Sequence, residues 1–265
     1  MRQKAFACAG FALLLGILAF PVLAQSRSIN YETYIVDSFD GSEDTDWSWT
    51  AAGSKFITDG YPVVKYFDGM PNAMRVMQTD EDGNYQVLGI QFKFNRQGDN
   101  WVDIIPMAAA EGGDGESPYE IPFRGVVSRI DMWVWGAGYY YQLEVLLRDC
   151  YGRVHALPMG TLNYEGWRNL SVNVPTNLPQ TSRYLGDEHN MRFVAFRIRT
   201  SPTERVDDFY VFFDQLKVLT DTYSPSYDGF EFAGADFSDD SGSDSGSGEN
   251  AETQPAPAEE EEAGI

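Results

Sequence analysis

Cysteine and histidine are nearly absent from this sequence of 265 residues, which contains two of each. Cys8 lies in an apolar N-terminal run, so Cys150 has no second cysteine in the rest of the chain with which to form a disulfide. Two histidines and one cysteine are too few for a zinc site. The phosphate-binding Gly-x-x-x-x-Gly-Lys-Ser/Thr, the Gly-x-Ser-x-Gly and the His-Glu-x-x-His patterns are also missing. We therefore expect no cofactor and no catalytic residue.

Basic residues are scarce as well. The chain has 19 Lys+Arg against 40 Asp+Glu, and its formal net charge is −21. A surface this acidic repels phosphate backbones and anionic lipid headgroups. We expect no nucleic-acid partner and no insertion into a membrane. Solubility of an exported protein would explain the same charge, so the charge by itself identifies no partner.

The main apolar run lies at the N-terminus, where Arg2 and Lys4 precede AFACAGFALLLGILAF. A short basic region, an apolar segment and small residues at its end are typical of a secretory signal. Val22-Leu23-Ala24 fits the small-residue rule for cleavage. We therefore expect residues 1–24 to be a cleaved signal peptide and the remaining chain to be exported.

The C-terminal segment, residues 233–265, consists mainly of Ser, Gly, Glu and Pro. It has ten acids and no base between Asp236 and Glu262. Such a segment cannot bury enough apolar surface to offset the entropy of ordering, so we expect a disordered acidic tail. Residues 25–232 remain, which is a suitable length for one β domain.

Alternating apolar and polar residues indicate strands throughout this region. In YYYQLEVLLRD, for example, Leu143, Val145 and Leu147 share one face. Period 2 with one polar face is typical of antiparallel sheets that are solvated on one side. Several such segments are bounded by Gly, Pro, Asn and Asp, and no convincing amphipathic helix is found. The sequence predicts an all-β fold, an antiparallel two-sheet sandwich or jelly roll.

Two tryptophans lie on the expected polar face of the segment VVSRIDMWVWG. Ile130, Met132 and Val134 form its apolar face, and Trp133 and Trp135 point the other way. Exposed tryptophans stack sugars or anchor protein interfaces. Alternatively, a loop or the start of the acidic tail covers them. Three tyrosines follow directly, and the candidate partner-binding residues are Trp133, Trp135, Tyr139, Tyr140 and Tyr141.

Acidic residues are too numerous for a catalytic carboxylate pair to be argued from sequence. A calcium site is conceivable at Asp37, near the first strand, and Asp214, in the last strand, because terminal strands often lie side by side in jelly rolls. The simpler interpretation is that both are turn or strand-edge acids. We therefore expect no metal site.

The segment RDCYGRVHA places Cys150 and His155 close together in sequence. Asp149-Cys150-Tyr151-Gly152 separates two alternating strands, which predicts a hairpin turn with a positive φ at Gly152. A catalytic cysteine needs a lowered pKa and a third group that orients the histidine. The segment offers no helix and no cleft-forming loop, which favours the hairpin over a catalytic pair.

Three stretches carry a family resemblance: YETYIVDSFDGSEDTDWSW, GVVSRIDMWVWGAGYYYQLEVLLRDCYGRVHALPMGTLNYEGWRNLSVNVP and FRIRTSPTERVDDFYVFFDQLKVLTD. The chain resembles the spirochaete periplasmic flagellar filament outer-layer (sheath) protein family, apart from the acidic tail. The middle stretch also looks like jelly-roll carbohydrate-binding modules, in which the equivalent of Trp167 opens a strand and does not contact ligand. We expect Trp167 to be a buried packing residue.

This resemblance implies a non-enzymatic structural protein of the periplasm, whose relatives coat a core of flagellins in a filament that drives motility. The implied partners are the flagellin core filament and other sheath subunits. A periplasmic carbohydrate-binding module is the alternative, and a jelly-roll glycoside hydrolase or lyase is a weaker one. A sandwich fold can host all three functions, so the fold does not separate them.

If the hairpin interpretation holds, Cys150→Ser leaves secretion, folding and incorporation into filaments near wild type. Incorporation is measured by immunoblotting of isolated filaments, and folding by circular dichroism. Loss of incorporation by a folded variant would instead indicate a functional thiol.

Overall fold

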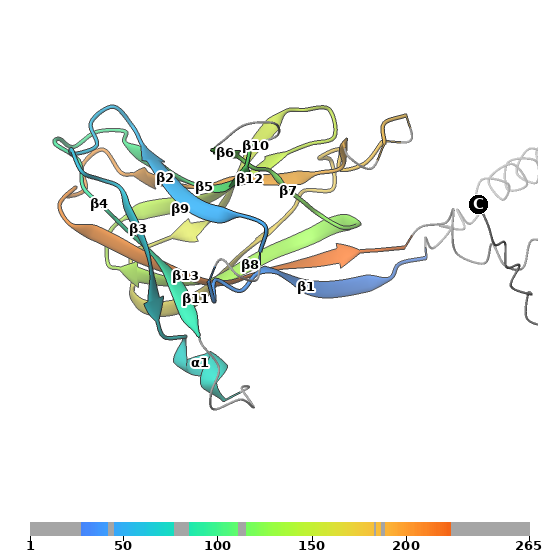
Figure 1. The fold of residues 1–265 in the computed structure, drawn as a ribbon, viewed down its shortest axis with the longest axis horizontal. Coiled ribbons are helices and arrows are strands. Elements are labelled where there is room, and N and C mark those ends of the chain that lie inside the picture. The colour runs from blue at the N-terminus through green and yellow to red at the C-terminus, as the bar shows by residue number, and fades with distance from the viewer. Residues whose placement is uncertain are drawn as a thin grey trace, which may run out of the picture. The chain divides into compact units, whose positions relative to one another are not determined.

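The structure, a computed structural model, describes residues 28–41, 45–76, 85–110, 115–182, 184–186 and 189–223. The segments expected to be a signal peptide (1–24) and an acidic tail (233–265) lie outside these residues. The described chain folds into two antiparallel sheets (Figure 1), which confirms the predicted all-β sandwich. No helix within these ranges is long and apolar enough to cross a membrane.

We name the two sheets by their strands. Sheet I contains β1 (Tyr31–Asp37), β3 (Val63–Asp68), β4 (Gln86–Phe92), β8 (Val126–Ala137), β11 (Glu165–Asn173) and β13 (Phe209–Asp221). Sheet II contains β2 (Ser48–Gly53), β5 (Trp101–Ala109), β6 (Glu116–Pro118), β7 (Ile121–Pro122), β9 (Tyr141–Arg148), β10 (Val154–Thr161) and β12 (Arg192–Thr200). A single turn of helix, α1 (Asn72–Arg75), follows β3.

The long strand β13 organises sheet I. The sheet runs β11-β8-β13-β4-β3, and β1 also pairs with β13. Residues 209–213 of β13 pair with β4, and residues 216–221 pair with β1, so one strand joins early and late parts of the chain. Sheet II runs β10-β9-β12-β5-β2, with β6 and β7 added at its side.

The apolar faces predicted from alternation meet between the sheets. Leu143, Val145 and Leu147 are completely buried in sheet II. In sheet I the apolar side of β8 is buried as expected. Phe196 of β12 and Phe213 of β13 pack across the interior with ring centroids 5.4 Å apart. The period-2 pattern therefore identified the correct face of each of these strands.

A buried carboxylate ties the two sheets together. Asp37, at the end of β1 in sheet I, accepts hydrogen bonds from the indole N–H groups of Trp47 and Trp49, each 2.8 Å long. Its other oxygen accepts the backbone N–H of Phe39 at 2.8 Å. Trp49 belongs to β2 of sheet II and stacks on Phe196. Burial raises the pKa of Asp37, and the three N–H donors oppose that rise by favouring the charged form.

We expect Asp37→Ala to lower the free energy of unfolding by about 3–5 kcal/mol, because buried indole and backbone donors lose their acceptor. Asp37→Asn is the matched control: its carbonyl oxygen can still accept both indoles, so it costs about 1–2 kcal/mol. Urea unfolding of both variants measures the difference. A cost below about 1 kcal/mol for Asp37→Ala would contradict the tying role.

Candidate interaction surface

A row of residues crosses five neighbouring strands on the outer side of sheet I. Trp167 (β11), Trp135 (β8), Phe212 (β13), Gly89 (β4) and Lys65 (β3) lie directly opposite one another in register. Residues opposite each other in antiparallel strands project to the same face. Because strands lie about 4.8 Å apart, the row extends roughly 19 Å across the sheet.

The aromatic rings of this face pack against one another. Trp135 stacks on Tyr210 with centroids 5.3 Å apart, and the edge of Phe212 meets Trp135 at 5.7 Å. Phe67 of β3 meets Phe212 edge-on at 5.5 Å. Mutual packing holds the rings in fixed orientations before any partner arrives. We call this surface the outer aromatic face, which comprises Phe67, Trp133, Trp135, Trp167, Tyr210 and Phe212.

Gly89 makes room for two rings of the outer aromatic face, which border a groove. A Cβ at this position would lie 2.6 Å from Phe67 and 2.9 Å from Phe212, so any larger residue would push the two rings apart. The groove has a volume of about 260 Å³. Lys65 and Gln91 supply its polar wall, beside Phe67, Phe212 and Tyr210. It combines an apolar floor with one cation at its side.

The predicted tryptophans lie on the expected side of β8. Met132 and Val134 are completely buried, while Trp133 and Trp135 point outward. Both side chains are half-buried, and Tyr210 and Phe212 pack against the Trp135 indole. Their role in binding a partner stays a prediction.

Two of the three candidate tyrosines do not belong to a surface. Tyr139 and Tyr141 are 6% and 1% exposed. Their hydroxyls donate to the carbonyls of Asp207 and Arg205, each at 2.7 Å, and burial raises the pKa of both phenols. Tyr140 is 57% exposed. The chain leaves β8 and enters β9 here, so alternate tyrosines turn into the core and only Tyr140 points to solvent.

The expectation that Trp167 packs in the core is wrong. Its partner in the register is Trp135, which faces outward. Leu170 of the same strand lies opposite the buried Met132 and supplies the core contact. Trp167 therefore adds to the outer aromatic face and is half-buried there.

The other half of the outer face of sheet I is polar. Lys217 forms an ion pair with Asp131 at 3.1 Å, and the Asn169 amide donates to the same carboxylate at 3.0 Å. Arg129 donates to the Ser171 hydroxyl at 2.7 Å. The aromatic residues thus occupy one end of the face, next to a paired set of charges.

Asp37 and Asp214, the two weak candidates for a calcium site, lie in different environments. The strands that carry them do pair, as expected for terminal strands. However, the three hydrogen bonds to Asp37 leave its carboxylate engaged by protein donors. Within the described ranges, no group of three or more His, Cys, Asp or Glu residues could hold a metal ion.

Asp214 has an unusual environment of its own. It is 4% exposed at a bulge of β13, beside Gln215, which has a φ of 50°. Burial raises the pKa of Asp214 to about 7, and the charge of Asp40 adds to the rise. The backbone N–H of Gln215 and the ammonium of Lys217 oppose it.

The Cys150 segment is a hairpin turn, as predicted. It connects β9 and β10, and Gly152 has a φ of 85°. The Cys150 side chain is buried, and burial raises the pKa of its thiol, which disfavours the nucleophilic thiolate. The Nε2 atom of His155 lies 2.7 Å from the Asp149 carboxylate, so the imidazole is engaged by an acid of the same turn.

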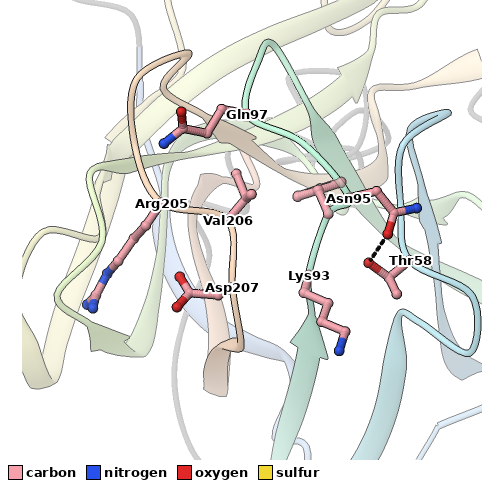
Figure 2. Close-up of a pocket in the computed structure, with 8 residues that line it drawn as sticks. Thr58, Lys93, Asn95, Gln97, Arg205, Val206 and Asp207 are labelled. Carbon is pink, nitrogen blue, oxygen red and sulfur yellow. Dashed lines mark hydrogen bonds between the residues drawn. The ribbon is translucent and has the colours of Figure 1, made fainter.

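A second hollow, of about 550 Å³, lies where the loops after β4 and β12 meet (Figure 2). Its two cations contact aromatic rings: Lys93 lies over Tyr61 at 5.2 Å and Arg205 over Tyr139 at 4.0 Å. The Thr58 hydroxyl donates to Asn95 at 3.0 Å. The polar groups of this hollow are therefore largely engaged by their own neighbours.

Sequence reasoning missed Phe67, Tyr210 and Phe212. In FYVFF of β13, apolar residues occupy both faces, so alternation could not show that Tyr210 and Phe212 point outward. The available signal was that this strand has two apolar faces, although each sheet was expected to be solvated on one side. Such a strand indicates apolar residues on the outer face.

The chain is similar to proteins of one known family. The family of flagellar filament outer layer proteins (FlaA) matches residues 28–228. A flagellar filament outer layer-like protein of Brachyspira hyodysenteriae is 24% identical over 194 residues, which cover 73% of this chain and 81% of that protein. A flagellar filament outer layer protein of Borreliella burgdorferi is 30% identical over 157 residues, or 54% of this chain and 46% of the relative.

Among solved structures, similar chains include two carbohydrate-binding modules. One, crystallised with β-1,4-galactotriose, has a TM-score of 0.37 and 14% identity over 71% of this chain and 99% of the module. A family 11 module of Clostridium thermocellum has a TM-score of 0.36 and 9% identity over 73% of this chain and 98% of the module. The sugars that these modules bind are ascribed to the modules and not to this chain.

The raised pKa of Asp214 generates a pH prediction. A carboxyl whose folded pKa is raised contributes stability at low pH, and that stability is lost as pH rises from about 4 through about 7. Asp214→Asn mimics the neutral form, so it should match wild type near pH 4 and exceed its unfolding free energy by roughly 4 kcal/mol above about pH 7. Urea unfolding at a pH below the raised pKa, at a pH near it and at a pH above it tests this prediction. A difference that does not change with pH would contradict the assigned environment.

Proposed function

Because the chain belongs to the flagellar filament outer layer protein family, we propose that it is a non-enzymatic subunit of the outer layer of a periplasmic flagellar filament. In this proposal it is exported through the N-terminal signal segment. It binds the flagellin core and neighbouring outer-layer subunits, and it supports motility.

The observation that carries the proposal is the row of outward residues across sheet I. A monomeric protein gains nothing in its core from Trp167, Trp135 and Phe212, since they lie on the side away from it. Aromatic residues on a fixed surface are the residue types that dominate protein interfaces. We therefore assign the outer aromatic face to contact with the filament core.

The geometry favours a protein partner that covers several strands at once. Trp135 has one ring face stacked on Tyr210, so that face is not free to stack a sugar. The groove beside Phe67, Phe212 and Tyr210 instead accepts a protruding side chain, and Lys65 at its wall can pair with an acidic or carbonyl group. A carbohydrate-binding module remains the alternative, and it would need a free ring face on Trp133 or Trp167.

A non-catalytic role is supported by the residues with reactive side chains. The Cys150 thiol is buried in a turn, where its pKa is raised and the thiolate is disfavoured. His155 is committed to Asp149. These side chains stabilise the β9–β10 hairpin.

Simultaneous replacement of Trp133 and Trp135 by Ser tests the assigned face. Interface tryptophans contribute about 2 kcal/mol or more each, so each replacement should weaken co-sedimentation with purified flagellin filaments roughly thirtyfold. The β-sheet circular-dichroism spectrum should persist, because neither ring belongs to the core. Raising the salt concentration should weaken wild-type binding too, since an acidic subunit docks by charge only onto basic patches.

Trp101→Ser is the matched control. Trp101 is a half-buried tryptophan on β5 of sheet II, where the Arg197 guanidinium lies over its ring at 4.8 Å. The control removes the same kind of side chain from the other sheet and should leave co-sedimentation unchanged. Equal binding by the double variant and wild type at every salt concentration would exclude the outer aromatic face, and binding of wild type to glycans alone would favour the alternative.

A further inference from the structure

Strand β1 forms an open edge of sheet I. It pairs with β13 from Tyr31 opposite Asp221 to Asp37 opposite Leu216, and within the described part of the chain it has no second partner strand. Figure 1 shows β1 lying alongside the C-terminal end of β13. Tyr31 is 59% exposed and Ile35 is 50% exposed.

The direction of the free backbone groups follows from the hydrogen bonds to β13. The carbonyl of Asn30 accepts the N–H of Thr222 at 2.9 Å, so the backbone of Asn30 faces β13. In an antiparallel pair, successive residues face alternately toward and away from the partner. The N–H and C=O groups of Tyr31, Thr33 and Ile35 therefore point to the open edge.

Three other edge strands of the sandwich carry a proline or a positively charged side chain, whereas the charged residues of β1 are the acids Glu32 and Asp37. Pro158 and a break in register lie in β10, Arg168 lies in β11, and Lys65 lies in β3. Prolines, charges and bulges are the usual protection of sheet edges. The sequence of β1, YETYIVD, has no Lys, Arg, Pro or Gly, and its register shift lies at the inner end, after Ile35.

We propose that β1 pairs with β1 of a second copy of this chain, antiparallel about a two-fold axis at Thr33. In this register Tyr31 lies opposite Ile35 of the second copy, and Thr33 lies opposite its own equivalent. Aromatic–β-branched and Thr–Thr pairs are favourable across antiparallel strands. Glu32 lies opposite Tyr34, so the two Glu32 carboxylates do not face each other directly.

The same register satisfies the backbone. Every residue with outward-pointing groups lies opposite another such residue, and each of these pairs exchanges two hydrogen bonds. The side-chain pairs Tyr31–Ile35 and Thr33–Thr33 make the sequence around Thr33 complementary to itself, and this complementarity favours a second copy as the partner. An isologous contact of this kind closes with two subunits.

The pairing has a consequence for binding to the filament. A two-fold axis perpendicular to the sheet places both outer aromatic faces on the same side of one continuous sheet. Two weak faces then act together, and their combined affinity exceeds that of either face. This consequence rests on the proposed function, whereas the pairing of β1 does not.

Cross-linking tests the register. Thr33→Cys and Glu32→Cys are each made in a Cys150→Ser background. The Cα atoms of the two substituted residues would be about 5.5 Å apart in the Thr33→Cys dimer, within the range for a disulfide. In the Glu32→Cys dimer they would be roughly 8 Å apart, beyond that range. We expect mild oxidation of the purified chain to yield mostly disulfide dimers of the first variant and monomers of the second.

Thr33→Pro tests the backbone contribution. Proline removes an N–H that points away from β13, so pairing within the subunit is kept while an added strand is disfavoured. Sedimentation equilibrium should show a dissociation constant at least about tenfold above wild type, and Thr33→Val, the control that keeps the N–H, should stay within about twofold. Because each copy is strongly acidic, salt should tighten the dimer, the reverse of its effect on filament binding.

Three outcomes would overturn the proposal: a wild-type chain that is monomeric at all concentrations, equal cross-linking of the Thr33→Cys and Glu32→Cys variants, or a folded Thr33→Pro variant that associates as tightly as wild type. If Thr33→Pro fails to fold, the two cysteine variants still decide the question. All of these measurements use the purified chain without filaments, so they are independent of co-sedimentation. When Thr33→Cys is combined with the replacement of Trp133 and Trp135 by Ser, cross-linking should be as efficient as in the Thr33→Cys variant with both tryptophans intact. The pairing of β1 is thereby tested separately from the outer aromatic face.

Discussion

The buried carboxylate of Asp37 is the contact on which the arrangement of the two sheets depends. It is the last residue of β1 in sheet I, and through the indoles of Trp47 and Trp49 it holds the start of sheet II against the core. A charge removed from water needs several donors around it, and three N–H groups meet that need here. The same carboxylate, a candidate metal ligand from the sequence, ties the two sheets together.

The two sheets present different outer surfaces because their outward residues differ. Sheet I carries mutually packed aromatic rings, whereas the outer side of sheet II carries charges. Among these, the Arg197 guanidinium donates two hydrogen bonds, of 2.6 and 2.7 Å, to the Asp103 carboxylate. Glu144, opposite Arg197, is 8% exposed, and one of its oxygens accepts no hydrogen bond from the residues that the structure describes. The packed aromatic rings of sheet I therefore distinguish the two outer surfaces of the sandwich.

Sequence reasoning predicted the strands, the two-sheet architecture and the facing of β8, because alternation is a local property of each segment. Of the strand neighbours it predicted only the β9–β10 hairpin and the pairing of the first and last strands. Trp167 was assigned to the core since only its register with Trp135 shows that it faces outward. The run of three tyrosines from Tyr139 gave no alternation to read, and the contact between Phe67 and Phe212 joins residues far apart in sequence. What was missed depends in most cases on partners that are distant along the chain.

The pairing of β1 with β13 also constrains when the domain can fold. The Asn30 backbone N–H donates to the Asp221 carboxylate across a separation of 191 residues, and β13 is the shared neighbour of β1, β4 and β8. Sheet I therefore lacks its central strand until almost the whole domain sequence is available. Folds dominated by such distant pairings form slowly. Under the proposed export through the N-terminal signal segment, a chain that cannot complete its central sheet early would stay unfolded long enough to pass through a narrow translocation pore.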